Sequence, residues 1–172
     1  MSDFLKLRLV DADDEPFLRA LRAQVDVERL GLQAWSPEQA ELARSLIDLQ
    51  FKAHGAHYRQ VKANRDTKDC IMELSGVRVG RFIVTQDGKE VYLSDIAVCW
   101  EHRGKGLGQA VIDATKAECV QSKRVLRLHV DPLNPVVQFY LNLGFRIVDT
   151  QPTSYLMEWV PPAVADRTTR YV

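Results

Sequence analysis

The sequence predicts an α+β domain with a mixed, mostly antiparallel central sheet flanked by helices. Two-residue turn signals at Ser75-Gly76 and Asp87-Gly88 separate apolar runs of strand length, which predicts consecutive hairpins. A third run, residues 90–98, leads through a glycine-rich loop directly into a helical pattern. Residues 145–149 and 154–160 are typical of a closing hairpin. Strands joined both by hairpins and by one helical crossover define this fold class.

The N-terminal part predicts a strand and then two helices. Residues 5–10 alternate leucine with other side chains, which is the period of a half-buried strand. Apolar residues then recur at helical spacing to about residue 29, and Pro16 suits the first turn of that helix. The residues that can cap this helix are Asp11, Asp13 and Asp14. A second helix is expected from Ser36, with Gln39 closing a capping box, to residue 57 or 58.

The remaining elements follow in the order β-β-β-α-β-α-β-β. The polar residues 59–68 predict a loop. The expected elements are strands at 70–74, 77–85, 90–98 and 125–130, helices at about 105–121 and 135–143, and the closing hairpin. Asn134 can cap the second of these helices, and Gly144 can end it. We expect one domain over residues 1–160 and a tail over 161–172 that is mobile or packs on a partner.

Composition excludes several classes of function. The 172 residues carry equal numbers of acidic and basic side chains, so a bulk electrostatic grip on nucleic acid or membrane is not expected. No apolar run is long enough to span a bilayer, and the first residues lack the core of a secretion signal. Three widely spaced cysteines predict neither disulfides nor a zinc site and favour the reducing cytoplasm.

The loop after residue 98 has the features of an anion site. Arg103 and Lys105 place positive charge among glycines at the start of a helix. A helix N-terminus presents unpaired N–H groups, and glycines let a phosphate approach them. A plain strand-to-helix turn is the alternative interpretation. The residues that would contact the anion are Arg103, Gly104, Lys105, Gly106, Leu107, Gly108 and Gln109.

The spacing of the loop excludes two common phosphate motifs. Lys105 is followed by Gly106 rather than Ser or Thr, so this is no Walker A loop, and the third glycine of a dinucleotide motif is missing. The pattern [Q/R]-x-x-G-x-[G/A] fits at Arg103, Gly106 and Gly108. It resembles the acetyl-CoA pyrophosphate loop of the GNAT superfamily of N-acetyltransferases. The stretch ending Leu143-Gly144-Phe145 also resembles that family's L-Y-x-x-x-G-F signature.

This resemblance covers residues 69–160 well and implies the GNAT fold, in which the fourth and fifth strands part to admit the cofactor's pantetheine arm. It implies acetyl-CoA as co-substrate. Backbone groups of Ile96, Ala97 and Val98 would pair with the pantetheine amides as an added strand does. By resemblance, the Val98 N–H would stabilise the oxyanion. Asn134 resembles a residue that contacts the cofactor arm, and its helix-capping role is compatible with that contact.

Three side chains are candidates for catalysis. Tyr140 matches the family's usual acid for the departing thiolate, and its alternative is simple packing beside Phe139. His129 lies where related ribosomal-protein acetyltransferases carry a glutamate base, and we expect it on a half-buried strand. Asp95 is the next candidate for the base. A water chain, or an amine that arrives neutral, would need no such residue.

The acceptor is not identified by the sequence. An amine-bearing small molecule or a peptide is expected, bound by residues 13–58 and the last hairpin. Both a monomer and a homodimer are compatible with the sequence. The candidates for the acceptor cleft are Trp35, His54, His57, Tyr58 and Tyr155, with Asp26, Glu28 and Glu41 as acidic groups for a cationic amine. No metal is expected. The competing hypothesis is a non-catalytic acyl-CoA sensor on the same fold, which would not require Tyr140.

Overall fold

The computed structural model describes residues 4–30, 36, 38–39, 42, 45, 66–162 and 164. Its seven strands form one sheet in the order β1-β2-β3-β4-β5-β7-β6. The strands are β1 (Leu5–Leu9), β2 (Asp66–Leu74), β3 (Val77–Asp87), β4 (Glu90–Val98), β5 (Val125–Val130), β6 (Arg146–Gln151) and β7 (Ser154–Trp159). The helices among these residues are α1 (Glu15–Leu30), α3 (Leu107–Ser122) and α4 (Val136–Asn142), with short 3-10 turns η1 (Ala12–Asp14) and η3 (Trp100–His102).

The predicted fold class is confirmed. β4 and β5 run parallel, whereas β1 with β2, β5 with β7, and β6 with β7 are antiparallel. The sheet is therefore mixed and mostly antiparallel, and the three described helices occupy their predicted places in the chain order. Both two-residue turns lie between strands that neighbour each other in the sheet, so both predicted hairpins are present.

The chain divides into two compact units. Unit 1 comprises Met1–Phe82 and Ile96–Lys105, and unit 2 comprises Ile83–Asp95 and Gly106–Val172. The core of unit 1 is built from Leu18, Leu21, Cys70, Ile71, Met72, Val79 and Phe82. The core of unit 2 is built from Ile83, Val91, Leu93, Val111, Ile112, Leu126, Leu128, Phe145 and Met157.

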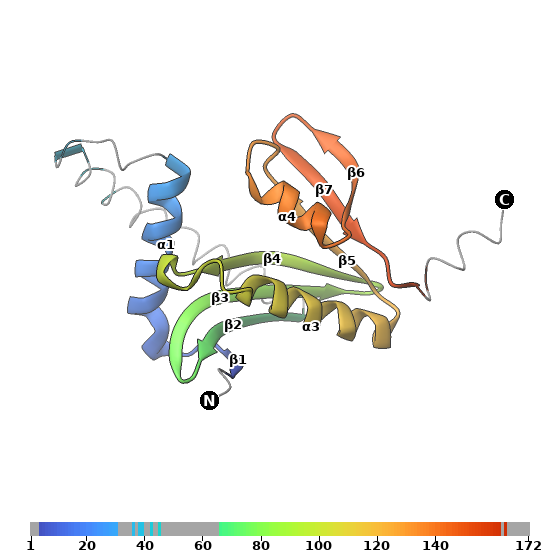
Figure 1. The fold of residues 1–172 in the computed structure, drawn as a ribbon, viewed down its shortest axis with the longest axis horizontal. Helices are drawn as coiled ribbons and strands as arrows, with labels where there is room; N and C mark the ends of the chain where they lie inside the picture. The colour runs from blue at the N-terminus through green and yellow to red at the C-terminus, as the bar shows by residue number, and fades with distance from the viewer. Residues whose placement is uncertain are drawn as a thin grey trace. The chain divides into compact units, whose positions relative to one another are not determined.

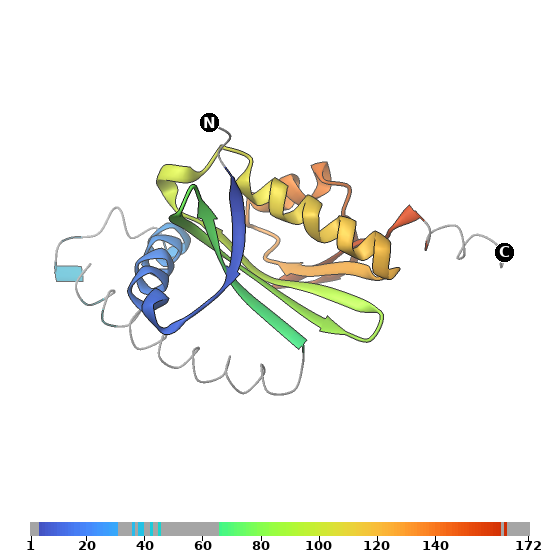
Figure 2. The same ribbon diagram turned by 90° about the horizontal axis from the view of Figure 1, so that it is seen from below.

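In unit 1, β1 lies antiparallel along β2, and the chain then turns into α1 (Figure 2). The register places Leu5 opposite Leu74 and Leu9 opposite Cys70. Asp11 is the helix cap that the sequence predicts: its side chain accepts from the Asp13 N–H over 2.9 Å. The Asp11 N–H in turn donates to Asp14 Oδ2 over 2.9 Å, which completes a capping box around η1 rather than around the first turn of α1.

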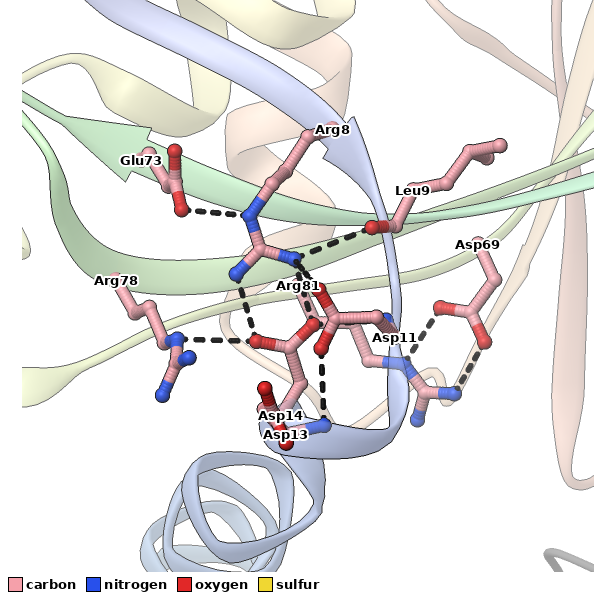
Figure 3. A network of polar contacts seen from close by, with 9 residues as sticks. All are labelled: Arg8, Leu9, Asp11, Asp13, Asp14, Asp69, Glu73, Arg78 and Arg81. Carbon is pink, nitrogen blue, oxygen red and sulfur yellow. Dashed lines mark hydrogen bonds and ion pairs between the residues drawn. The ribbon is translucent and has the colours of Figure 1, made fainter.

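The carboxylate of Asp14 is the centre of a buried ion network (Figure 3). Its two oxygens accept from Arg8 over 2.6 and 2.7 Å, and Arg78 lies 3.0 Å away. Arg8 also donates to Glu73 over 2.6 Å. The hydrogen bond from Arg8 holds the pKa of Asp14 at about 2, against the opposing effect of burial. The start of α1 is thereby fixed to β1 and β3, and through Arg8 to β2.

The capping box expected at the start of the second helix is present, and most of the residues predicted to form this helix lie outside the described ones. The Ser36 N–H donates to Gln39 Oε1 over 3.0 Å, and the Gln39 N–H donates to Ser36 Oγ over 3.4 Å. These two bonds are the expected capping box. The predicted end of this helix at residue 57 or 58 lies outside the described part of the chain.

The prediction of a loop over residues 59–68 is wrong at its end, because β2 already begins at Asp66. A buried acidic residue explains the difference. The Asp69 carboxylate accepts two hydrogen bonds from the Arg81 guanidinium, at 2.9 and 3.0 Å, and the Asp69 carbonyl accepts one from the Val10 N–H. Polar composition suggested a solvated loop, but here the charge is paired across neighbouring strands.

In unit 2, β5 runs beside β4 on one side and β7 on the other. Leu126, Leu128 and Val130 are buried, whereas the residues between them are more exposed, as expected for a strand with one face on the core. Figure 1 shows α4 against the β6–β7 hairpin, and a Cβ added at Gly144 would lie 3.7 Å from the Trp159 ring.

Two general features complete the description. None of the helices in the described residues is long and apolar enough to cross a membrane. Cys70, Cys99 and Cys119 are buried, and none of the three forms a disulfide with another described cysteine. Burial raises the pKa of the Cys119 thiol to about 11. These thiols act as small apolar core groups.

Candidate active site

The predicted site residues fall on both units. Ile96, Ala97, Val98, Arg103, Gly104 and Lys105 belong to unit 1, and Asp95, Gly106, Leu107, Gly108, Gln109, His129, Asn134 and Tyr140 belong to unit 2. The two groups are continuous along the chain, because β4 and the loop after it each run from one unit into the other.

Parallel pairing between β4 and β5 ends before β4 does. The register runs from Glu90 opposite Val125 to Leu93 opposite Leu128, whereas β4 continues to Val98. The register therefore agrees with the parting of these two strands that the sequence resemblance implies. Beyond Leu93, the edge of β4 on the side of β5 is no longer part of that ladder.

The end of β4 presents alternate backbone groups to β3. The Cys99 N–H donates to the Val79 carbonyl over 2.9 Å. The Ala97 carbonyl lies so close to Gly80 that a Cβ added there would be 2.3 Å from its oxygen. Because backbone groups of a strand alternate between its two edges, the N–H of Val98 points away from β3. It therefore points to the edge where pairing with β5 has ended.

The loop between β4 and α3 has two left-handed glycines. Gly104 has φ +71° and Gly106, the cap of α3, has φ +75°, which non-glycine residues rarely adopt. The helix therefore begins at Leu107, and the prediction of a start at 105 is wrong. No side chain caps this helix and its first turn holds no acidic residue, so the N–H groups of its first turn have no competing carboxylate within it.

The two cations of the loop have different surroundings. Arg103 donates through Nε to the Val98 carbonyl over 3.0 Å and through Nη1 to Glu28 over 2.7 Å. Lys105 is exposed, and among the described residues it forms no ion pair. Lys105 is thus available to a solution anion, whereas Arg103 already holds a carboxylate.

Tyr140 is held by the structure that ends α4. The Phe145 N–H donates to the Tyr140 carbonyl over 3.1 Å, the Gly144 N–H donates to the Leu141 carbonyl over 2.9 Å, and Gly144 has φ +81°. This is a Schellman motif, with the ring of Phe145 on that of Tyr140 at 5.6 Å. The L-Y-x-x-x-G-F signature therefore encodes a helix end as well as a phenol.

The phenol of Tyr140 is buried, and its hydroxyl makes no hydrogen bond to the described residues. Burial raises the pKa of Tyr140 to about 12, and the negative charge of Asp95 adds to the rise. Two of the predicted catalytic residues, Tyr140 and Asp95, are thus close enough to interact electrostatically. Near neutral pH the phenol is protonated.

β5 is half-buried as expected, and His129 lies on its exposed face. It lies between the buried Leu128 and Val130, so its side chain points away from the core of unit 2. Its Nδ1 lies 3.1 Å from Ser154 Oγ on the neighbouring strand β7. The imidazole of His129 thus has a hydrogen-bond partner in Ser154 and is also in contact with solvent.

Asn134 performs the capping function that the sequence suggested. Its Oδ1 accepts from the Val136 N–H over 3.0 Å, and its carbonyl accepts from the Val137 N–H over 3.0 Å. The helix itself is one residue shorter at each end than predicted, since Pro135 and Leu143 are its flanking caps. Contact of Asn134 with a cofactor stays a prediction.

Residues 66–147 match the family model of the acetyltransferase (GNAT) domain. This match identifies a GNAT domain in residues 66–147. The matched segment includes the strand, the glycine loop, α3 and α4, and therefore covers every predicted catalytic and cofactor-binding residue. No curated protein matches the chain in sequence.

Solved structures share the fold of this chain. The PaiA N-acetyltransferase of Thermoplasma acidophilum, in complex with coenzyme A, is 19% identical with a TM-score of 0.69 and matches 91% of this chain and 99% of its own. An acetyltransferase of Thermus thermophilus is 20% identical with a TM-score of 0.65, and the match covers 91% of this chain and 96% of its own. The ribosomal-protein-S18-alanine N-acetyltransferase of Escherichia coli is 16% identical with a TM-score of 0.59, and the match covers 91% of this chain and 94% of its own. At these identities the likeness concerns the fold.

Sequence reasoning missed Lys116, which supports the end of α4 in the GNAT domain. Its ammonium donates to the Leu143 carbonyl and lies 5.3 Å from the Phe145 ring and 5.4 Å from the Trp159 ring. Burial lowers its pKa. The helical spacing could have indicated this position, because Lys116 follows the buried Ile112 by one turn of α3 and so lies on the same face of the helix.

The acceptor candidates are only partly visible. Trp35, Glu41, His54, His57 and Tyr58 lie outside the described residues. Tyr155 is half-buried on β7. Asp26 is buried and paired with Arg22 at 2.8 Å, so it is not free to attract an amine. Glu28 is more exposed but holds Arg103. No cluster of three metal-ligating side chains occurs in the residues that the structure describes.

Proposed function

We propose that this chain is an acetyl-CoA-dependent N-acetyltransferase that moves the acetyl group to a primary amine by direct attack on the thioester. The observation that carries the proposal is the start of α3, where an uncapped first turn without acidic residues follows two left-handed glycines. Such a site suits a diphosphate. The GNAT family match and the coenzyme A complex of the Thermoplasma structure support the same ligand.

The cofactor would be held by residues 96–109 and Asn134. The N–H groups of Leu107, Gly108 and Gln109 would bind the pyrophosphate, with Lys105 adding charge. The pantetheine arm would lie along the edge of β4 beyond Leu93, where the ladder with β5 has ended. The Val98 N–H, which points to that edge, would donate to the thioester oxygen as negative charge develops there.

Tyr140 would supply the proton that the reaction requires at sulfur. The amine nitrogen forms a bond to the carbonyl carbon, the carbon–sulfur bond breaks, and sulfur takes its electron pair. A phenol with a pKa of about 12 is protonated at neutral pH and can give that proton to the thiolate. The hydroxyl has no hydrogen bond to the described residues that the sulfur would need to displace.

The proton of the amine would go to Asp95 or His129. Asp95 interacts with Tyr140 within unit 2, which favours it on position. His129 has the open solvent access that a proton acceptor needs, and Ser154 orients its ring. The kcat–pH profiles of Asp95→Asn and His129→Gln decide between them, because only loss of the true base removes the acidic limb of the profile.

The acceptor class is proposed as a small-molecule amine or a peptide amine. The Escherichia coli protein is by name an N-acetyltransferase of an alanine of ribosomal protein S18. A shared fold does not transfer this specificity, because one fold can carry many different functional sites. We therefore propose the chemistry of the acceptor, a primary amine, and no individual molecule.

An amine screen tests the proposal. Acetyl-CoA should raise the melting temperature of the purified chain, and free thiol should appear when a suitable amine is supplied from a library of polyamines, amino sugars and unblocked peptides. Stabilisation without thiol release for any amine would favour the acyl-CoA sensor. Absence of stabilisation at saturating acetyl-CoA would contradict both functions.

A further inference from the structure

One face of α1 contacts the segment that leads into the glycine loop. Gln24 Oε1 accepts from the Trp100 N–H over 3.2 Å, and one turn later Glu28 Oε2 accepts from Arg103 Nη1 over 2.7 Å. All four residues belong to unit 1. The helix expected to border the acceptor thus touches, through one carboxylate, a cation expected to bind the cofactor.

The ion pair between Glu28 and Arg103 is exposed. The side chains of Arg103 and Glu28 keep 37% and 54% of their surfaces in solvent. Exposed pairs of this kind contribute little to stability and exchange partners readily. The second anchor of Arg103, the bond from Nε to the Val98 carbonyl, does not use the carboxylate and leaves the guanidinium beside Gly104 when Glu28 is released.

The two anions that Arg103 can hold differ in strength. A pyrophosphate offers several oxygens in the fork geometry of a guanidinium and more charge than one carboxylate. A cofactor bound at the start of α3 would therefore compete with Glu28 for Arg103. Each such exchange leaves an exposed, unpaired carboxylate on α1, next to the loop.

This inference rests on the proposed function. We propose that Glu28 is an acceptor-binding residue and that its carboxylate is paired with Arg103 until the cofactor binds. The cofactor pyrophosphate takes the Arg103 guanidinium, and the released Glu28 carboxylate binds a cationic group of the acceptor amine. The acceptor class is accordingly a cationic amine. The two ligands then bind with positive coupling, because each removes a competitor of the other.

Calorimetric titration with coenzyme A tests the first half. Glu28→Gln should bind coenzyme A about two- to fivefold more tightly than the wild type, because Arg103 no longer has a competing carboxylate. Arg103→Gln, which keeps a donor for the Val98 carbonyl, should bind it more weakly. In the Arg103→Gln background the gain from Glu28→Gln should largely disappear.

Glu101→Gln is the matched control. It removes the same charge from an exposed position two residues before Arg103, but Glu101 forms no ion pair with Arg103. An equal gain in both variants would show a general charge effect and overturn the proposal. Unchanged or weaker binding of coenzyme A by a folded Glu28→Gln variant would overturn it as well.

Steady-state kinetics with the best amine of the screen test the second half. Glu28→Gln should raise the KM of the amine several-fold at saturating acetyl-CoA, with kcat nearly unchanged, since Glu28 binds the acceptor and takes no part in the chemical step. An unchanged KM overturns the acceptor role. If the wild type itself fails to bind coenzyme A, the proposed function fails. If it binds and Glu28→Gln behaves as the wild type, only this inference fails.

Discussion

Tyr140 has a structural role at the end of α4, and we propose a catalytic role for its hydroxyl. It lies one turn before Gly144 in the Schellman end of α4, and its ring packs between Phe139 and Phe145 at 5.5 and 5.6 Å. Packing explains the ring, but it does not require the hydroxyl. The hydroxyl is the part that the proposed chemistry uses.

Replacing Tyr140 with Phe separates the two roles. The variant keeps the ring contacts, so its melting temperature and its affinity for coenzyme A should stay close to those of the wild type. Its kcat should fall by about a hundredfold or more, the range expected for loss of an acid catalyst. Tyr92→Phe is the control, because the Tyr92 hydroxyl binds Glu90 over 2.8 Å on β4. Equal kcat in Tyr140→Phe and the wild type, with chemistry rate-limiting, would remove Tyr140 from the mechanism.

Single residues were predictable where their function is local. The loop glycines and the caps Asp11 and Asn134 act within a few positions of themselves, so sequence spacing reveals them. The pair between Glu28 and Arg103 joins residues 75 positions apart, and no local pattern signals it. The contact of His129 with Ser154 likewise joins residues 25 positions apart on two different strands.

At the scale of elements, the end of α4 depends on a left-handed glycine. Gly144→Ala should destabilise the protein by about 1–2 kcal/mol, because φ +81° is unfavourable for a residue with a Cβ. Space is not the cause, since the added carbon would meet Trp159 at an ordinary 3.7 Å. Gly144→Asn should cost less, because asparagine tolerates this region. Denaturant unfolding measures both, and equal stability of all three proteins would contradict the argument.

The end of β4 depends on a close approach of backbones at Gly80. Gly80→Ala would bring a Cβ within 2.3 Å of the Ala97 carbonyl oxygen, and a backbone cannot yield as a flexible side chain does. We expect a loss of about 1–3 kcal/mol in unfolding free energy. Because the shift would displace Ala97 and Val98, the affinity for coenzyme A should fall too. Wild-type affinity in a folded Gly80→Ala variant would show that the end of β4 does not bind the cofactor.

Elements were predictable where turn and cap chemistry marks their ends. The hairpin turns at Ser75-Gly76 and Asp87-Gly88 and the glycine that ends α4 all lie at the predicted positions. Errors occurred where tertiary pairing overrides composition. Asp69 is charged yet buried, because Arg81 on β3 binds it, and β2 therefore extends into a segment that looks like a solvated loop.

At the scale of the whole chain, the ion network around Asp14 predicts a loss of stability in acid. The folded pKa of Asp14 is lowered to about 2, so its contribution is complete above the unfolded value near 4 and is lost as the pH falls toward 2. The linked contribution is about 2 kcal/mol. Asp14→Asn should be less stable at pH 6 and should lack this acid-dependent step in unfolding free energy.

Asp13→Asn is the matched control for this prediction. Asp13 is the neighbouring aspartate of η1, but it is exposed, and its side chain does not join the pairs of Asp14 with Arg8 and Arg78. The control should keep the step between pH 4 and pH 2. Persistence of the full step in a folded Asp14→Asn variant would show that other carboxylates cause it.

The order of elements and the family were predictable, because the strand, glycine loop, helix and L-Y-x-x-x-G-F stretch are all contiguous in the chain. The family model covers this same region. The acceptor was not predictable for a physical reason. Its binding surface is expected from segments far apart in the sequence, and their side chains carry no spacing rule of the kind that a pyrophosphate loop requires.

The central claim is that residues 103–109 bind the pyrophosphate of coenzyme A. A crystal structure of the complex tests it most directly, through the position of the diphosphate density. The account predicts this density within hydrogen-bonding distance of the N–H groups of Leu107, Gly108 and Gln109, with the pantetheine arm leading to Val98. Diphosphate density bound elsewhere on the chain would contradict the claim.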